Sequence, residues 1–346
     1  MRRRAFLALP AALRAAPDPL VLGAYSSPKT FWERGGRLDE YGINAIFTGH
    51  RSIDEALLGR ARKEGSRVFA EFPAWNGRDW LKQPENAASW PIDETGQRSP
   101  AQTWFQGICP TNEAFLRSRL AELEQLVTTR RVDGVWLDYL HWHAQFEDPR
   151  PGLPETCFNA SCVERFRRES GVKVAGDGPR DWAADILKRR QTAWREWRCS
   201  VVVDFARRCR AVLAKHAPGM LLGNYQCAWR DDEHAGARRR VLGLDLPAMA
   251  RVFDVLSPMV YHGRSGQPVG WVRRNVEWLS GRLRREAVKI WPIVQAHQAP
   301  AAEFEQAMRG GLAGRASGVM MFTLAAVAED PEKMAVLQKL YRGLRA

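Results

Sequence analysis

Short apolar segments rich in β-forming residues alternate with longer amphipathic segments eight times along this chain. The apolar segments are predicted strands, at residues 20–26, 42–48, 67–75, 132–142, 220–226, 254–262, 289–296 and 318–324. The amphipathic segments are predicted helices, the clearest at 52–64, 112–129, 180–216, 269–285, 301–312 and 331–344, with weaker candidates at 28–40 and 246–251. Regular alternation of strand and helix is typical of a parallel sheet whose faces are covered by helices.

An open, doubly wound sheet would show the same alternation, but it usually carries a glycine-rich phosphate turn after its first strand. Here that position reads Ala24-Tyr25-Ser26-Ser27-Pro28, and no dinucleotide or P-loop fingerprint occurs in the chain. Eight units in 346 residues therefore favour an α/β fold of one closed (β/α)8 TIM barrel. Long loops are predicted after strands three and four, at 76–110 and 143–179, and would form walls around one side of the barrel mouth.

Residues 1–16 read as an export signal or a disordered leader. Three arginines, Arg2 to Arg4, precede a short apolar stretch and small residues, which resembles a twin-arginine signal. We therefore expect export to the periplasm or the exterior, with a ragged cytoplasmic N-terminus as the alternative. Residues 17–346 are expected to form a single (β/α)8 barrel domain.

The formal net charge of +13 raises the question of a nucleic-acid partner. The basic residues are spread over helical segments and are not interleaved with a recognised nucleic-acid motif, so we expect an arginine-rich, solvated surface. No apolar run reaches the roughly 18 residues that a membrane span requires. We expect neither a nucleic-acid partner nor an integral membrane span, and the sequence does not indicate an oligomeric state.

The fourth predicted strand ends in an acid, Asp138, followed by aromatic and imidazole side chains. A buried strand has no reason to end in a carboxylate, because desolvating an unpaired charge costs several kcal/mol, unless that end opens on a site. Side-chain alternation predicts that Trp136 and Asp138 point into the barrel, while Leu137 and Tyr139 face the helices. We interpret Asp138 as a catalytic residue.

The carboxyl ends of the barrel strands converge on one mouth, so the residues there are candidates for binding a substrate. Carboxylates, amides and aromatic rings without a set of metal ligands suit a sugar, whose apolar face stacks on rings while its hydroxyls form hydrogen bonds. The predicted substrate-binding residues are Tyr25, Trp75, His141, Trp142, Asn224, Gln226, Tyr261 and Gln295.

Hydrolysis of a glycosidic bond requires a second carboxyl group besides Asp138. The candidates are Glu71 on strand three, the acids at 231–233, of which Asp232 and Glu233 are the favoured pair, and Glu147 in the loop after strand four. Structural alternatives stay open: Glu71 as an ion-pair partner, and the acids at 231–233 as a solvated loop.

Neither a metal nor a cofactor is expected. His141 and His143 form an H-x-H pair, but no other strand end supplies matching ligands. Cys157 and Cys162 are close enough in sequence for a loop disulfide, and two unlinked thiols are the alternative. A metal clip at these cysteines would need two further ligands.

Four segments together resemble those of bacterial glycoside hydrolase-like TIM-barrel proteins. They are Cys109-Pro110-Thr111-Asn112 before a helix, Asp133 to Tyr139 with the pattern D-G-x-x-L-D-Y, Cys157 to Cys162 opening a helix, and Ser257-Pro258-Met259-Val260-Tyr261. The resemblance covers nearly the whole chain after the leader. It implies a (β/α)8 fold and activity on carbohydrates, with Asp138 at the place where such families keep an acid.

The sequence thus predicts a glycoside hydrolase that cleaves O-glycosidic bonds of a polysaccharide or glycan. In this reading Asp138 acts as nucleophile, base or stabilising carboxylate, and Glu71 or an acid at 231–233 donates the proton. The alternative is a barrel that binds carbohydrate without turnover.

Overall fold

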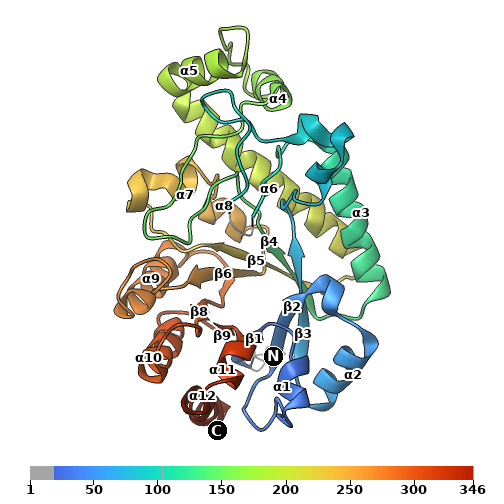
Figure 1. Cartoon of the computed structure of the whole chain (residues 1–346), viewed down its shortest axis with the longest axis vertical. Helices are drawn as coiled ribbons and strands as arrows, with labels where there is room; N and C mark the ends of the chain where they lie inside the picture. Colours follow the sequence, from blue (N-terminus) through green and yellow to red (C-terminus); the bar gives the residue numbers. More distant parts are fainter. Residues whose placement is uncertain (1–18, 103–104, 346) are drawn as a thin grey trace, which may run out of the picture.

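The chain folds into a closed barrel of parallel strands surrounded by helices (Figure 1), seen in a computed structural model that describes residues 19–102 and 105–345. The strands are β1 Val21–Tyr25, β2 Ala45–Gly49, β3 Arg67–Pro73, β4 Gly134–Asp138, β5 Leu221–Cys227, β6 Val255–Val260, β7 Lys289–Ile290, β8 Ile293–Gln295 and β9 Gly318–Phe322. Neighbouring strands pair in sequence from β1 to β6, β6 pairs with both β7 and β8, and β8 pairs with β9. Pairing of β9 with β1 closes the ring, which confirms the predicted TIM barrel.

All eight predicted strand segments are found, and the seventh is split in two. Trp291 and Pro292 separate β7 from β8. Proline has no backbone N–H to donate to the ladder, which accounts for the break. The fourth strand is shorter than the predicted segment 132–142, since it runs from Gly134 to Asp138.

Most helices cover the outside of the ring, and two of those between β4 and β5 lie above its mouth (Figure 1). The helices are α1 Lys29–Glu33, α2 Glu55–Lys63, α3 Glu113–Thr129, α4 Ala160–Ser170, α5 Pro179–Arg189, α6 Gln191–His216, α7 Ala237–Arg240, α8 Leu246–Ala250, α9 Gly270–Arg282, α10 Ala301–Gly311, α11 Leu324–Ala328 and α12 Pro331–Arg345. Several start at side-chain caps: Asp54 accepts the N–H of Leu57 at α2, and Asn112 that of Phe115 at α3. The predicted helix at 180–216 is two helices, α5 and α6, which meet at Arg190. No helix of the described ranges is long and apolar enough to cross a membrane.

Aromatic side chains fill the lower interior of the barrel. Trp136 stacks on Trp291 with ring centroids 5.4 Å apart, and its Nε1 donates to Ser257 Oγ at 2.9 Å. Phe47 and Phe69 pack edge-on against the same indole. The prediction that Trp136 points inward is confirmed by this cluster, while Leu137 belongs to the layer between strands and helices. The aromatic layer forms a solid floor beneath the mouth.

The two long segments after β3 and β4 pair with each other above the mouth. The first contains short 3-10 helices, η2 Trp80–Lys82 and η3 Pro84–Ser89, and the second contains α4. An isolated β-bridge joins Asp93 to Thr156, and the Phe158 N–H donates to the Ile92 carbonyl at 2.9 Å. These contacts hold both segments over one side of the barrel, as shown toward the top of Figure 1.

Residues 1–18 lie outside the described ranges, so the predicted export signal or leader at 1–16 remains a prediction.

Candidate active site

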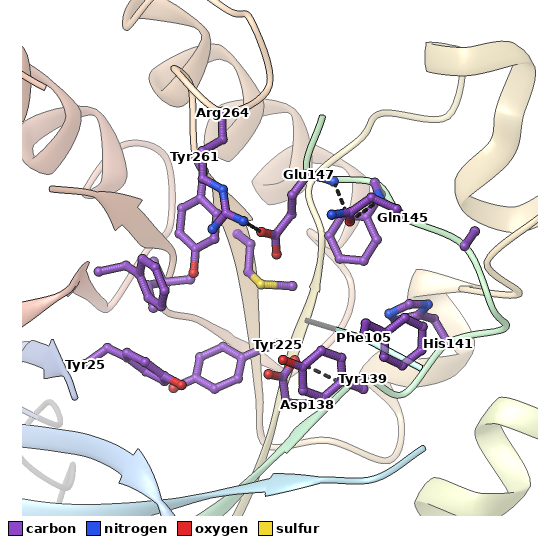
Figure 2. A pocket seen from close by; sticks show the side chains of 15 residues that line it. Tyr25, Phe105, Asp138, Tyr139, His141, Gln145, Glu147, Tyr225, Tyr261 and Arg264 are labelled. Carbon is purple, nitrogen blue, oxygen red and sulfur yellow. Dashed lines mark hydrogen bonds and ion pairs between the residues drawn. The ribbon is translucent and has the colours of Figure 1, made fainter. Parts of the chain in front are cut away.

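A cavity of about 320 Å³ opens at the carboxyl end of the barrel, within the size range of small-molecule sites. Strand ends, the residues that directly follow β4 and β6, and the two long segments together form its wall (Figure 2). The lining residues are Tyr25, Phe105, Asp138, Tyr139, His141, Ala144, Gln145, Phe146, Glu147, Tyr225, Met259, Tyr261, Arg264, Ile293 and Phe322. Of the residues predicted for the site, Asp138, Glu147, Tyr25, His141 and Tyr261 are among them.

Asp138 and Glu71 form a half-buried pair of carboxyl groups that are hydrogen-bonded to each other. Their strands are neighbours, with Pro73 level with Asp138 and Glu71 level with Trp136, so both side chains point into the barrel. Tyr25 donates a hydrogen bond of 2.5 Å to Glu71 Oε2, and the Tyr139 N–H donates to Asp138 Oδ1 at 2.8 Å. The pair therefore joins strands β1, β3 and β4 at the mouth.

Burial and mutual repulsion make this pair hold a proton. Burial and the nearby charge of Glu71 raise the pKa of Asp138 well above its ordinary value. Burial also raises the pKa of Glu71, but hydrogen bonds from Tyr25 and Asp138 oppose the rise. Because Glu71 is the member that accepts these bonds, we assign the shared proton to Asp138 and the charge to Glu71.

Glu147 is a third acid in the same cavity, and Figure 2 shows it across the cavity from Asp138. Its Oε2 lies 2.7 Å from Arg264 Nη2 in the loop after β6, and both side chains are mostly buried. Burial raises the pKa of Glu147 to about 6, and the guanidinium of Arg264 limits that rise. Glu147 is thus mostly ionised at neutral pH, whereas burial and the charge of Glu71 raise the pKa of Asp138 and favour its protonated form.

Aromatic rings make up much of the remaining wall. Phe105 stacks on Tyr139 with ring centroids 5.1 Å apart, and Phe322 lies between Tyr25 and Tyr261 at 4.9 and 5.0 Å. The hydroxyl of Tyr225, which is buried, has no hydrogen-bond partner within the described ranges. Such an unpaired group at a cavity wall is suited to a hydroxyl of a bound ligand.

Tyr139 lies in the cavity wall, so the prediction that it faces the helices is wrong. The strand ends at Asp138, and Tyr139 takes a left-handed backbone conformation with φ of 55°. Side-chain alternation holds only while the chain stays extended, so the turn places two consecutive residues on the cavity.

Five predicted substrate-binding residues lie outside the cavity wall. Trp75 and Trp142 are fully buried in the outer core, where their rings pack edge-on. On β5, Asn224 faces outward and its Nδ2 donates to the Leu137 carbonyl at 2.9 Å. Gln226 is buried on that same side of the strand, which leaves Tyr225 to face the cavity.

Gln295, the fifth, lies behind the cavity wall and positions the loop that carries Arg264. Its Oε1 accepts the Arg264 N–H at 3.0 Å, and its Nε2 donates to the His297 carbonyl at 2.9 Å.

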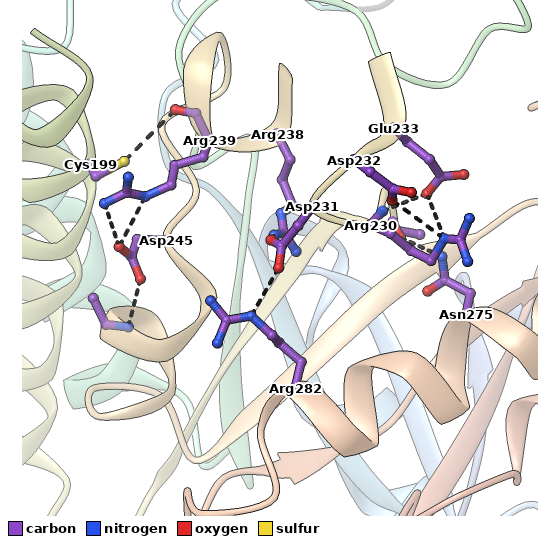
Figure 3. A network of polar contacts seen from close by, with 12 residues as sticks. Cys199, Arg230, Asp231, Asp232, Glu233, Arg238, Arg239, Asp245, Asn275 and Arg282 are labelled. Carbon is purple, nitrogen blue, oxygen red and sulfur yellow. Dashed lines mark hydrogen bonds and ion pairs between the residues drawn. The ribbon is translucent and has the colours of Figure 1, made fainter. Parts of the chain in front are cut away.

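The acids at 231–233 belong to a separate polar network (Figure 3) and are not brought together with Asp138. Asp231 pairs with Arg238 and Arg282. The side chain of Asp232 is 80% exposed, and Glu233 accepts hydrogen bonds from the Arg230 N–H and from Trp271. These contacts match the structural alternative of a charged surface loop.

The H-x-H histidines make contacts with the backbone. The Gly107 N–H donates to His143 Nδ1 at 3.0 Å, so His143 Nε2 carries the proton that it donates to the Pro100 carbonyl. His141 Nδ1 pairs with the Trp142 carbonyl at 2.8 Å. Burial lowers the pKa of both rings to about 4. Both imidazoles are therefore neutral at pH 7, and His143 ties the two long segments together.

All six cysteines are free thiols, which matches the alternative of unlinked Cys157 and Cys162. Cys109 joins these two, and the three Sγ atoms lie within 4.8 Å of one another in a fully buried cluster. The sequence provides no spacing signal for this grouping, because Cys109 lies on the other long segment.

No known family model matches the sequence, and no curated protein matches it either. Solved structures share its fold at low identity. The glycoside hydrolase domain of PgaB (BpsB) from Bordetella bronchiseptica superposes with a TM-score of 0.68 at 13% identity, covering 92% of this chain and 98% of that domain. The β-galactosidase from Bacillus circulans sp. alkalophilus gives 0.69 at 12%, covering 94% of this chain and 56% of its own.

The polyextremophilic β-galactosidase from the Antarctic haloarchaeon Halorubrum lacusprofundi gives a TM-score of 0.70 at 12% identity, covering 94% and 58%. This chain thus spans little more than half of either galactosidase. At these identities the comparisons establish the fold, which is the TIM barrel found in glycoside hydrolases.

Proposed function

We propose that this protein is a glycoside hydrolase in which Asp138 and Glu147 act from opposite sides of the cavity. The observation that carries the proposal is that the carboxyl groups of Asp138 and Glu147 face one aromatic-walled cavity from opposite sides. A pair of acids whose environments separate their protonation states is what general acid–base cleavage of a glycosidic bond requires. The shared fold with solved glycoside hydrolases supports the same reading.

Asp138 is the proton donor in this proposal. Its proton passes to the glycosidic oxygen as the bond to the anomeric carbon breaks. Loss of that proton leaves two charges on the Asp138–Glu71 pair, and their repulsion favours rapid return of a proton from solvent. Glu71 and Tyr25 therefore act as positioning residues. The role of proton donor, which the sequence suggested for Glu71 or an acid at 231–233, is assigned to Asp138 in this proposal.

Glu147 is the ionised partner. It acts on the anomeric carbon directly or through a water molecule, and Arg264 keeps it charged at neutral pH. Stacking on Phe105, Tyr139 or Phe322 would orient the apolar face of a sugar, and the Tyr225 hydroxyl would bind one of its hydroxyl groups. In this proposal the acid–base chemistry is carried out by side chains of this chain, with a water molecule as the reactant that hydrolyses the bond.

The test is a screen of the purified protein on 4-nitrophenyl glycosides and soluble polysaccharides, with release of nitrophenol or reducing ends as the readout. We expect turnover on at least one substrate, and a loss of about 10²-fold or more in kcat for Asp138→Asn, the range attributed to general acid–base catalysis. Asp232→Asn is the matched control, because Asp232 is exposed and remote from the cavity.

Binding without turnover is the second candidate function, and the unpaired Tyr225 hydroxyl among aromatic rings would serve it equally well. Saturable glycan binding by both the wild type and Asp138→Asn, with no product from either, would select this alternative.

A further inference from the structure

A second hollow adjoins the cavity on the side of β2 and β3. It has a volume of about 800 Å³ and lies between the strand ends, η2, η3 and the first turns of α3. We call it the α3 groove. Its lining residues are Gly49, His50, Arg51, Ser52, Glu71, Pro73, Asn76, Arg78, Asp79, Trp80, Gln83, Glu85, Asn86, Phe115, Ser118, Arg119 and Glu122.

The α3 groove meets the cavity at the carboxyl pair. Glu71 lines the groove, while its hydrogen-bond partners Tyr25 and Asp138 line the cavity. Gly49 also lines the groove, and a Cβ built on it would lie at an ordinary contact distance, 3.9 Å, from Glu71 Oε2. Because Glu71 lines the groove and Asp138 lines the cavity, a ligand at the pair could extend into both hollows.

The lining of the groove suits a neutral, hydroxyl-rich ligand. The groove is lined by three guanidinium groups, on Arg51, Arg78 and Arg119, and by four carboxyl groups, on Glu71, Asp79, Glu85 and Glu122, so it has no net attraction for a polyanion. Amides of Asn76, Gln83 and Asn86 and the indole of Trp80 complete a mixture of donors, acceptors and an aromatic face. Sugars are bound by such mixtures.

Arg119 adds an unpaired donor to this lining. The residue is only 9% exposed, and its Nη1 pairs with Glu122 Oε2 at 2.6 Å. Its Nε and Nη2 have no hydrogen-bond partner among residues 19–102 and 105–345. A buried guanidinium that is only half satisfied is costly, and acceptor oxygens of a ligand in the groove would offset that cost.

We propose that the α3 groove binds further sugar units of an extended glycan whose scissile bond lies in the cavity beside Asp138, between Asp138 and Glu147. The inference rests on the proposed function, and it narrows the substrate to oligosaccharides or polysaccharides that occupy both hollows. Glycosides of a single sugar would occupy the cavity alone and be poorer substrates.

The experiment compares two-unit and six-unit cello-, galacto- and chito-oligosaccharides. Cleavage is followed by reducing-end release with the wild type, and binding by calorimetry with the Asp138→Asn variant. Ser118→Trp blocks the groove, because Ser118 is an exposed α3 residue that lines it. Gln125→Trp places the same side chain on an exposed site of α3 outside the groove and is the matched control. Equal melting temperatures of the two variants would verify that both are folded.

We expect the six-unit form to be preferred over the two-unit form by on the order of tenfold in kcat/KM, equivalent to about 1.4 kcal/mol. Ser118→Trp should abolish that preference while keeping activity on the two-unit form, and Gln125→Trp should retain it. Cleavage with no length preference, or a preference that survives Ser118→Trp, would overturn the groove proposal and leave the glycosidase proposal standing.

Failure of the glycosidase proposal can also be told apart from failure of the groove proposal. Tighter binding of the six-unit form that Ser118→Trp removes, without turnover of any oligosaccharide, would support the groove and refute hydrolysis. Neither turnover nor length-dependent binding would refute both.

Discussion

Replacing Glu147 with glutamine should remove the loss of unfolding free energy that ionisation of this carboxyl group causes as the pH rises. Burial raises the pKa of Glu147 from 4.5 to about 6, so the folded state holds this proton more tightly than the unfolded chain does. At about 1.4 kcal/mol per pH unit, the rise corresponds to about 2 kcal/mol. The stability from this group is fully present below pH 4.5 and is lost as the pH rises through about 6.

The assay is urea unfolding from pH 4 to pH 8, followed by tryptophan fluorescence. Other groups titrate in both proteins, so the informative quantity is the free energy of unfolding of the wild type minus that of Glu147→Gln. We expect this difference to fall by about 2 kcal/mol across the range. Asp232→Asn, at an exposed carboxylate, is the control and should run parallel to the wild type.

Arg264→Met sharpens the same prediction. The guanidinium 2.7 Å from Glu147 lowers the pKa of that carboxyl, so its removal should raise the pKa above about 6 and move the loss of stability to higher pH. Curves for the wild type and Glu147→Gln that stay parallel from pH 4 to pH 8 would refute the assignment of a buried, titrating Glu147.

Further predictions concern the barrel interior, a helix cap and the thiols. Gly223→Ala should lower the free energy of unfolding by about 1–3 kcal/mol, because a Cβ there would overlap the indole of Trp136. Gly59→Ala should raise the free energy of unfolding by about 0.5–1 kcal/mol, because the position lies in helix α2 with open space around it. Urea unfolding of both variants checks these values. Asn112→Ala should cost about 1 kcal/mol by the same assay, through loss of the α3 cap, and no change would count against the capping bond. A thiol-specific chromogenic reagent should label none of the six buried cysteines in the native protein and all six in urea; fewer than six in urea would indicate a disulfide.

The alternation of strands and helices could be predicted from the sequence because each barrel unit carries its own periodicity. Interruptions within a strand or helix are harder to predict, because the local signal is a single residue. Examples are Pro292, which splits the seventh strand, and Arg190, which separates α5 from α6. Asp138 was identifiable because a carboxylate at the end of an apolar strand is costly anywhere except at a site.

The rest of the site depends on which way each side chain points. Asn224 and Gln226 are expected at the mouth on residue type alone. Strand alternation places Tyr225 on the opposite face from both, and the structure shows that Tyr225 faces the cavity. Trp75 and Trp142 read as sugar platforms, but such large apolar rings are also suited to the core beneath long loops, where they lie. The pairing of Glu147 with Arg264 joins loops 117 residues apart, and no local pattern encodes that contact.

The central claim is that Asp138 and Glu147 cleave a glycosidic bond between them while the acids at 231–233 do not take part. It is tested most directly by kcat/KM for Asp138→Asn, Glu147→Gln and Asp232→Asn on the best substrate found in the screen. We predict losses of about 10²-fold or more for the first two variants and an unchanged value for the third. Wild-type turnover in Asp138→Asn or Glu147→Gln, or its loss in Asp232→Asn, would contradict the account.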